Sequence, residues 1–255
     1  MEKYFILTVL CVVVVALVLT ACTNYNSVLD QSKTYGLTSN IKSLDIKLGA
    51  ADFSIEYSDK FSLESNLKHL SVSEKNGVLV VVDETKLSAN YENAVFKLYI
   101  PKDVVFENVN ISTGAAQITS VALSANTLKL KLGAGKVQFA SLNASSNVEI
   151  KGGTGDITVA SGTLNNLKLG LGVGKLDMTA TLLGKSNLKF GVGDSNLTLL
   201  GNRADYNLNV EKGIGTININ GNDVSDYNSS GKGNNYVSIE GGVGTINVSF
   251  LNKTL

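Results

Sequence analysis

Few residues in this sequence have the type and spacing that acid–base or nucleophilic catalysis needs. His69 is the only histidine and lies between Lys68 and Leu70 in a predicted strand, where a structural role is favoured over that of a general base. No serine lies in a recognisable nucleophile turn. Glycoside hydrolysis needs two carboxyl groups roughly 5–10 Å apart, whereas the acidic residues here are scattered and there is no tryptophan on which a sugar would stack. We therefore predict no enzymatic activity and no cofactor, and a polysaccharide-acting β-helix enzyme is the least favoured alternative.

Glycine-rich segments raise two further kinds of chemistry, phosphate binding and calcium binding. Phosphate binding needs a helix after the glycines, but strand patterns follow every copy. The segment 152–156 (Gly-Gly-Thr-Gly-Asp) is similar to the calcium-binding repeat of some solenoids, in which an aspartate recurs in every coil. At the place of Asp156, other copies carry Lys136, Lys175 and Thr216, and an ammonium group repels calcium. We predict no metal site.

The most irregular segment is the polar stretch 221–235, which occupies the longest interval between glycine elements. Loops that project from a solenoid often carry recognition. Asp223, Asp226, Tyr227 and Lys232 are therefore the candidate recognition residues. The alternative interpretation is a tolerated polar insertion without a binding role.

The glycines recur at a regular period along the chain. The Gly-x-Gly elements begin at Gly133, Gly153, Gly172, Gly191, Gly213 and Gly242, and degenerate copies begin at Gly49 and Gly114. From Gly114 the steps are 19, 20, 19, 19, 22 and 29 residues. Apolar residues alternate with polar ones before and after each element, which predicts two strands that face a common interior. Such a unit cannot bury its own apolar face, so it must stack on its neighbours. The pattern predicts an all-β fold, a β-solenoid or β-helix with about 20 residues per coil.

Two columns of charge support this stacking. One contains Lys136, Asp156, Lys175 and Asp194, and the other contains Lys129, Glu149 and Lys168. If equivalent positions stack, the signs alternate from coil to coil, and each pair contributes a few tenths of a kcal/mol.

We expect a solenoid domain over 41–255, with an N-terminal β-sheet section at 41–110 and regular coils at 111–250. In the first section, strands are predicted at Phe61–Leu67, His69–Ser73, Val78–Val82 and Val95–Ile100, with a hairpin turn at Asn76-Gly77. The predicted last coil, Thr245–Phe250, would leave a free edge unless 251–255 covers it. A free edge would allow end-to-end stacking into a homodimer.

The N-terminus carries an apolar run from Ile6 to Ala21 that ends in Leu-Thr-Ala-Cys. This ending resembles a bacterial lipobox, in which Cys22 receives the lipid. We predict a signal peptide at 1–21, a flexible tether at 22–40, and an exported protein that a lipid holds on the cell membrane, facing away from the cytoplasm. The alternative is an uncleaved N-terminal anchor with an incidental cysteine. Since Cys11 also lies in this run, the folded part has no cysteine for a disulfide.

Several segments resemble a known family. They are 44–52 (Leu-Asp-Ile-Lys-Leu-Gly-Ala-Ala-Asp), the Leu-Tyr-Ile-Pro step at 98–101, and strands that run into Gly-x-Gly-Asp-Ile, as at 148–157. They are similar to the DUF4097 family of proposed adhesins and to the toast-rack domains of envelope stress proteins, over roughly residues 40–250. The resemblance implies a bacterial β-solenoid at the cell envelope and supplies no catalytic residues.

These observations favour a non-catalytic binding module, adhesin-like or structural, that contacts an envelope protein or a polysaccharide. The alternative is an envelope-stress regulatory component that acts through a protein partner. The single candidate membrane segment favours the first. With 22 basic and 22 acidic residues there is no net field to attract nucleic acid, and we predict no such partner.

Overall fold

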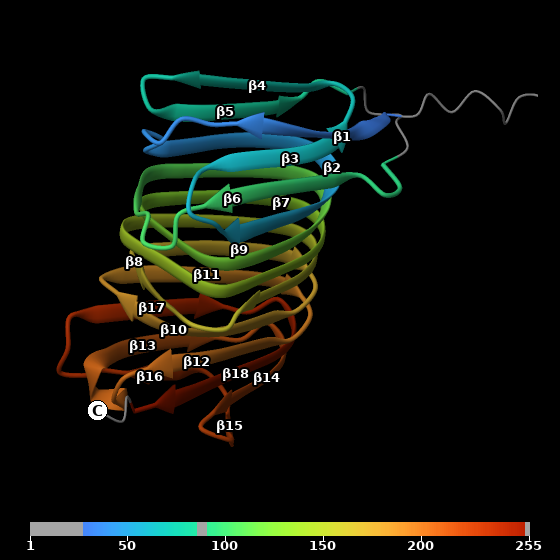
Figure 1. The fold of residues 1–255 in the computed structure, drawn as a ribbon. Helices are drawn as coiled ribbons and strands as arrows, with labels where there is room; N and C mark the ends of the chain where they lie inside the picture. The colour runs from blue at the N-terminus through green and yellow to red at the C-terminus, as the bar shows by residue number, and fades with distance from the viewer. Residues whose placement is uncertain (1–27, 86–90, 253–255) are drawn as a thin grey trace, which may run out of the picture.

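The computed structural model describes residues 28–85 and 91–252. Its elements are β1 (Leu29–Gly36), β2 (Ser43–Tyr57), β3 (Ser62–Leu67), β4 (Leu70–Lys75), β5 (Val78–Asp83), β6 (Val95–Ile100), β7 (Phe106–Val159), β8 (Gly162–Asn165), β9 (Leu167–Val173), β10 (Leu176–Leu183), β11 (Lys185–Val192), β12 (Ser195–Leu200), a short 3₁₀ turn (Arg203–Asp205), β13 (Tyr206–Glu211), β14 (Ile214–Ile219), β15 (Asn222–Val224), β16 (Tyr227–Ser229), β17 (Asn235–Glu240) and β18 (Val243–Leu251). All 18 strands belong to one sheet that winds into stacked coils (Figure 1). The predicted all-β solenoid is confirmed.

The N-terminal predictions lie largely outside the described residues. This applies to the signal peptide at 1–21 and to Cys22. Within the described ranges, no helix has the length and apolar character that crossing a membrane requires. The predicted flexible tether over 22–40 is corrected at Leu29–Gly36, because these residues form β1, which pairs antiparallel with β3. This pairing satisfies backbone groups of the segment in the sheet.

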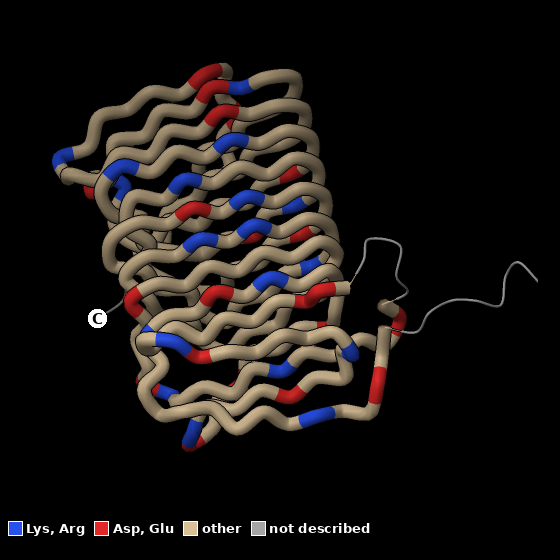
Figure 2. Tube along the Cα trace, turned by 90° about the horizontal axis from the view of Figure 1, so that it is seen from above, with Lys and Arg blue, Asp and Glu red and all other residues tan. Residues whose placement is uncertain are grey.

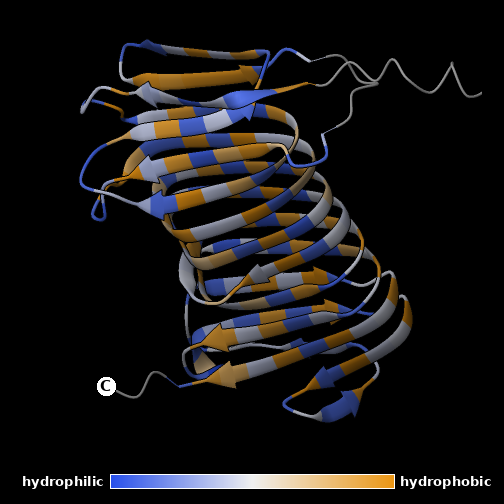
Figure 3. Ribbon diagram, turned by 45° about the vertical axis from the view of Figure 1, so that its right-hand side comes forward, coloured by the Kyte–Doolittle hydropathy of each residue, from blue (hydrophilic) through white to orange (hydrophobic). Residues whose placement is uncertain are grey.

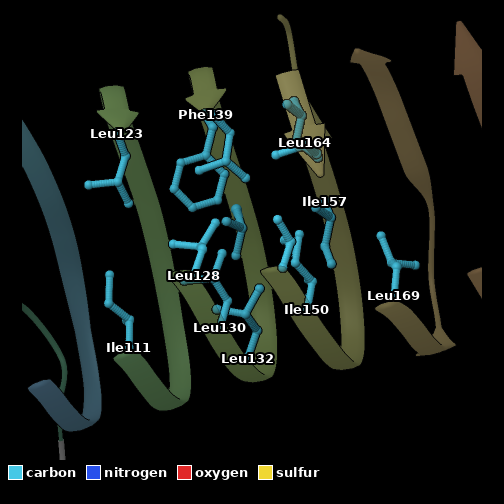
Figure 4. Packing of buried hydrophobic residues seen from close by; sticks show 14 of the residues in the cluster. Ile111, Leu123, Leu128, Leu130, Leu132, Phe139, Ile150, Ile157, Leu164 and Leu169 are labelled. Carbon is cyan, nitrogen blue, oxygen red and sulfur yellow. The ribbon is translucent and has the colours of Figure 1, made fainter. Parts of the chain in front are cut away.

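Each coil consists of a strand, a glycine corner, a second strand and a return segment. In the coil that begins in β7, Val148 and Ile150 precede the corner, while Ile157 and Val159 follow it, and all four are buried. Leu164 in β8 closes the coil from the return side. Orange and blue alternate along the strands in Figure 3, and Figure 4 shows the inward side chains stacked from coil to coil. The core is thus one continuous apolar column inside the solenoid.

The glycine corners stack directly on one another. Gly174 has a φ of +142°, and a Cβ atom there would collide with the carbonyl oxygen of Gly155 in the preceding coil. A side chain at this position is therefore excluded both by the positive φ and by the close approach of the backbone of the preceding coil. The glycine spacing read from the sequence marks these corners.

The first coil is β2, which lies in parallel register with β7 over both of its halves. The boundary at residue 110 is therefore not where the coils begin, since β2 already has coil geometry. β1 and the segments 58–85 and 91–105 cap this end: the hairpin β4–β5 extends one side of the stack, while β6, β3 and β1 extend the other. Asn76 and Gly77 both have positive φ, as the predicted hairpin turn requires.

At the C-terminal end, the coils do not stack in the order of the chain. β11 pairs with β17 and β12 pairs with β18, so the coil that is last in sequence lies directly on the coil at 185–200. The coil formed by β13 and β14 lies outside it, because β17 and β18 also pair with these two strands. The coil at 235–251 is therefore inserted between its two predecessors in the sequence. The 29-residue step to Gly242 is the length of chain needed to pass around the outer coil.

The predicted free edge at Thr245–Phe250 is therefore wrong. β18 is an internal strand between β12 and β14. The true end is the β13–β14 coil, and the irregular segment covers it: β15 pairs antiparallel with β14, and β16 pairs antiparallel with β13. End-to-end dimerisation through β18 thus loses its structural premise, since the backbone groups that it would use are already paired.

The charge columns are realised in part. Lys129 and Glu149, on successive coils, form an ion pair of 3.1 Å, and Lys151 contacts Glu149 at 2.6 Å. These two lysines lower the pKa of Glu149 to about 2, mainly through the hydrogen bond from Lys151. In the column that contains Asp156 and Lys175, the Asp156 carboxylate instead accepts a hydrogen bond from the backbone N–H of Lys175 on the next coil. Figure 2 shows both signs interspersed over the coils.

Candidate functional site

A hollow of about 790 Å³ lies on the side of the solenoid that carries the strands before the glycine corners, near the C-terminal end. Its residues come from β9, β11, β17, β13 and β16, which are consecutive neighbours in space. We call this hollow the outer groove and define it by six of its polar lining residues: Lys168, Asn187, Tyr236, Ser238, Asn209 and Asn228. Because coil 235–251 is inserted out of order, Tyr236 and Ser238 lie in the middle of the groove.

Strand register arranges these residues in rows that run along the solenoid axis. One row follows Lys168, Asn187, Ser238, Asn209 and Asn228 through direct register partners on five strands. A second row places Lys185, Tyr236 and Asn207 side by side. Since adjacent strands lie about 4.8 Å apart, the first row extends over about 19 Å. The groove thus presents polar groups at a regular spacing.

Several polar side chains in the groove make no hydrogen bond to any other described residue. Asn187, Asn228 and Ser238 have no side-chain partner in the described part of the chain, and neither do the ammonium groups of Lys168 and Lys185. The Tyr236 side chain is 50% exposed. Donors and acceptors that face solvent without internal partners are available to a ligand without any rearrangement of the fold.

On the opposite side of the same coils, asparagine amides have a structural role, because they bond to one another between coils. There, Asn218 donates to Asn247 at 2.8 Å, and Asn247 donates to Asn196 at 2.7 Å. Asn196 in turn donates to Asp177 at 2.6 Å. These amides, with Asp177, form a ladder of hydrogen bonds across four coils, in which each amide is bonded to its neighbour. The unpaired amides of the outer groove are not explained by such a role.

The wall of the groove is built by the end of the irregular segment. Asn207 holds this segment, since it donates to the carbonyl oxygen of Gly233 at 2.7 Å and accepts from the N–H of Gly231 at 3.0 Å. Arg203 donates to the carbonyl oxygen of Ser229 at 3.2 Å. The segment therefore does not project as a free loop but is bonded back onto β13, which gives the groove one fixed side.

The four candidate recognition residues are not brought together by the fold. Asp223 lies exposed on β15 opposite Asn218, and Asp226 accepts a hydrogen bond from the backbone N–H of Lys212. The backbone N–H of Lys232 donates to Ala204, and the Lys232 side chain is exposed. None of these residues lines the outer groove.

The Tyr227 side chain packs within the fold and is not free to contact a ligand. Its half-buried ring packs against the core, with the Arg203 guanidinium 5.7 Å from the ring centroid. The hydrogen bond and charge of Arg203 lower the pKa of the Tyr227 hydroxyl. The exposed aromatic residue of this region is Tyr236, which the sequence analysis did not single out. The signal that could have identified Tyr236 is an aromatic residue at an outward-facing position of a strand.

Residues considered for catalysis or metal binding do not form a cluster. His69 lies in the exposed turn before β4, so the predicted strand start at His69 is corrected to Leu70. No group of three or more His, Cys, Asp or Glu residues is close enough to hold a metal ion within 28–85 and 91–252.

Comparison with known proteins identifies the architecture. The family profile described as Toastrack DUF4097 matches residues 31–249, in agreement with the resemblance seen in the sequence. The chain is similar to a proposed cell adhesion protein of Clostridium sporogenes (21% identity, 87% of this chain and 99% of that chain, TM-score 0.40). It is also similar to a proposed adhesin (15%, 89% and 98%, 0.41) and a proposed lipid-binding protein (15%, 86% and 96%, 0.36), both of Parabacteroides distasonis. No curated protein is significantly similar to the chain.

Proposed function

Because the chain belongs to the Toastrack DUF4097 family, we propose that it is a non-catalytic binding module of the cell envelope that takes its ligand in the outer groove. The observation that carries this proposal is the set of unpaired polar side chains around Tyr236, whereas on the opposite side of the same coils Asn196, Asn218 and Asn247 are bonded to one another. Rigid strands hold these groups in place, so binding requires little ordering of the protein.

The groove proposal is tested with Tyr236→Ala. An exposed aromatic ring at the centre of a binding surface contributes a large share of the contact energy, so removal of the ring is expected to weaken attachment of the full-length protein to isolated envelope material by tenfold or more. The measurement is the fraction of protein that sediments with the envelope over a range of protein concentrations, with Cys22 replaced by serine in wild type and every variant.

Tyr57→Ala is the matched control, because Tyr57 is 40% exposed but belongs to β2, far along the stack from the outer groove. Loss of attachment with Tyr236→Ala alone supports the proposal. Equal attachment of both variants and wild type would exclude the outer groove as the binding surface.

We further propose that a lipid on Cys22 holds the module on the outer side of the membrane. Two acyl chains give a stable anchor, since each buried methylene contributes about 0.8 kcal/mol. Cys22→Ser is expected to release the protein from the membrane fraction or to leave its precursor uncleaved, and to abolish incorporation of labelled fatty acid. If the variant fractionates and migrates as wild type does, the lipid anchor is ruled out. Along the chain, this cysteine lies shortly before β1, which begins at Leu29.

A further inference from the structure

We infer that the ligand of the outer groove is an acidic polysaccharide, a chain of sugar rings that carries carboxylate or phosphate groups. This inference rests on the proposed function and specifies its ligand class. It draws on three properties of the groove: its charge, its hydrogen-bonding groups and its repeat.

The charge of the groove differs from that of the chain. The whole sequence is electrically balanced, yet the residues that line the groove include Lys168 and Lys185 and no acidic side chain. These two lysines are diagonal neighbours on β9 and β11, and neither forms an ion pair with a described residue. Two unpaired ammonium groups at one end of a groove attract a negative group of the ligand.

The nearby carboxylates do not cancel this charge. Glu149 is the register partner of Lys168, but it is already bound to Lys129 and Lys151. At the opposite rim, Glu240 is paired with Lys189. Glu211, which accepts a hydrogen bond from Asn209, is not a lining residue and lies on β13, three strands away from the strand of Lys168. The lysine end of the groove is therefore the place for the anionic group.

The hydrogen-bonding groups fit a chain of hydroxyl groups. The amides of Asn187 and Asn228 each offer both donors and an acceptor, and the hydroxyl of Ser238 lies between them in the row. A sugar hydroxyl also both donates and accepts, so an amide can either accept its hydrogen bond or donate one to it. The exposed ring of Tyr236 offers an apolar face with a polar tip, which suits the mixed apolar and hydroxylated faces of a sugar ring.

The repeat of the groove fits a polymer better than a single small molecule. Polar groups recur on successive strands about 4.8 Å apart, a spacing comparable to the length of one sugar ring. Five strands contribute to the row that begins at Lys168. A chain that lies along the solenoid axis would therefore meet one set of side chains per sugar, as repeated weak contacts on a rigid surface require.

The experiment compares sugar polymers that differ in their charged groups. Full-length protein in detergent is tested by biolayer interferometry against polygalacturonate, against the same polymer with its carboxyl groups methyl-esterified, and against a phosphomannan, whose sugar rings carry phosphate groups. We expect the polygalacturonate affinity to exceed that of the ester by at least tenfold and to fall with added salt. Lys168→Gln combined with Lys185→Gln is expected to remove this preference, whereas Lys131→Gln, an exposed lysine on the same side but in an earlier coil, is the control. Binding of the phosphate polymer beyond that of polygalacturonate would assign the anion as phosphate.

The outcomes separate this inference from the proposed function. If the ester and the free acid bind equally and Tyr236→Ala weakens both, the groove binds glycans but the acidic preference is overturned. If none of the three polymers binds while Tyr236→Ala still reduces attachment to envelope material, the groove is a binding surface for a different ligand and the polysaccharide inference fails. If the lysine and tyrosine variants bind all polymers as wild type does, both the inference and the groove are overturned as the binding site.

Discussion

A disulfide is expected to form between cysteines placed at residues 196 and 247, and none between cysteines placed at 196 and 218. In the structure, Asn196 and Asn247 are direct register partners on adjacent strands, and Asn247 lies between Asn196 and Asn218. Adjacent strands put the two Cα atoms about 4.8 Å apart, which is within the range of a disulfide. Two rungs separate 196 from 218 by about 10 Å, beyond the roughly 7 Å at which a bridge can close.

The double variants Asn196→Cys with Asn247→Cys and Asn196→Cys with Asn218→Cys are compared in a background in which Cys11 and Cys22 are replaced by serine. After mild oxidation, the first is expected to be almost fully cross-linked and the second not at all, as read from non-reducing gel mobility and the mass of linked peptides. A solenoid that stacks in chain order predicts the reverse, because 218 would then be the neighbour of 196. Formation of the 196–218 bridge would therefore refute the inserted coil.

Gly174→Ala is expected to destabilise the protein by about 3 kcal/mol or more. A φ of +142° is a conformation that an L-residue with a side chain adopts only with strain, at a cost of order 1–3 kcal/mol. The new Cβ would in addition collide with the carbonyl oxygen of Gly155, which is backbone and held by its own coil. The two coils must separate at this corner, which weakens pairing on both sides of it. The free energy of unfolding, measured by urea titration, reports the loss.

Gly170→Ala is the matched control. Gly170 belongs to the same coil, a Cβ atom there meets no heavy atom within 4 Å, and its φ is not in the positive range. We expect the stability to be unchanged or raised by about half a kcal/mol, because alanine reduces the freedom of the unfolded chain. Equal losses at 170 and 174 would mean that the glycine corners are not the tight stacking points that the geometry describes.

The period of the glycines was sufficient to predict the coil. Alternating apolar residues such as Val148 and Ile150 point to one face by strand geometry alone, and Gly-x-Gly marks a corner where no side chain fits. The hairpin at Asn76-Gly77 followed from turn chemistry in the same way. The identical pair Asn220-Gly221, also with positive φ at both residues, joins β14 to β15 and was the overlooked signal that the irregular segment folds back instead of projecting.

The stacking order was not accessible from the sequence, since every copy of the repeat presents similar edges to its neighbours. Backbone pairing is nearly independent of sequence, and Leu188 has an apolar partner whether Val210 or Ile239 comes next to it. Which of the two is chosen depends on the path of the chain through 200–235, where Asn207 and Arg203 anchor the segment by contacts distant in sequence. For the same reason, the outer groove could not be predicted from the sequence. Tyr236 lies beside Lys185 and Asn207 only because its coil is inserted between theirs.

By itself, then, the sequence determined the local unit, a coil of strand, glycine corner and strand, because side-chain alternation and the sterics of glycine act within about 20 residues. It also determined the stacking of these units, because a single coil cannot bury its apolar face. Only the tertiary structure decided which coil lies on which, where the ends are capped, and which polar side chains remain unpaired on the surface. Those properties arise from contacts between segments that are equivalent in sequence, and their assignment depends on the path of the chain between them.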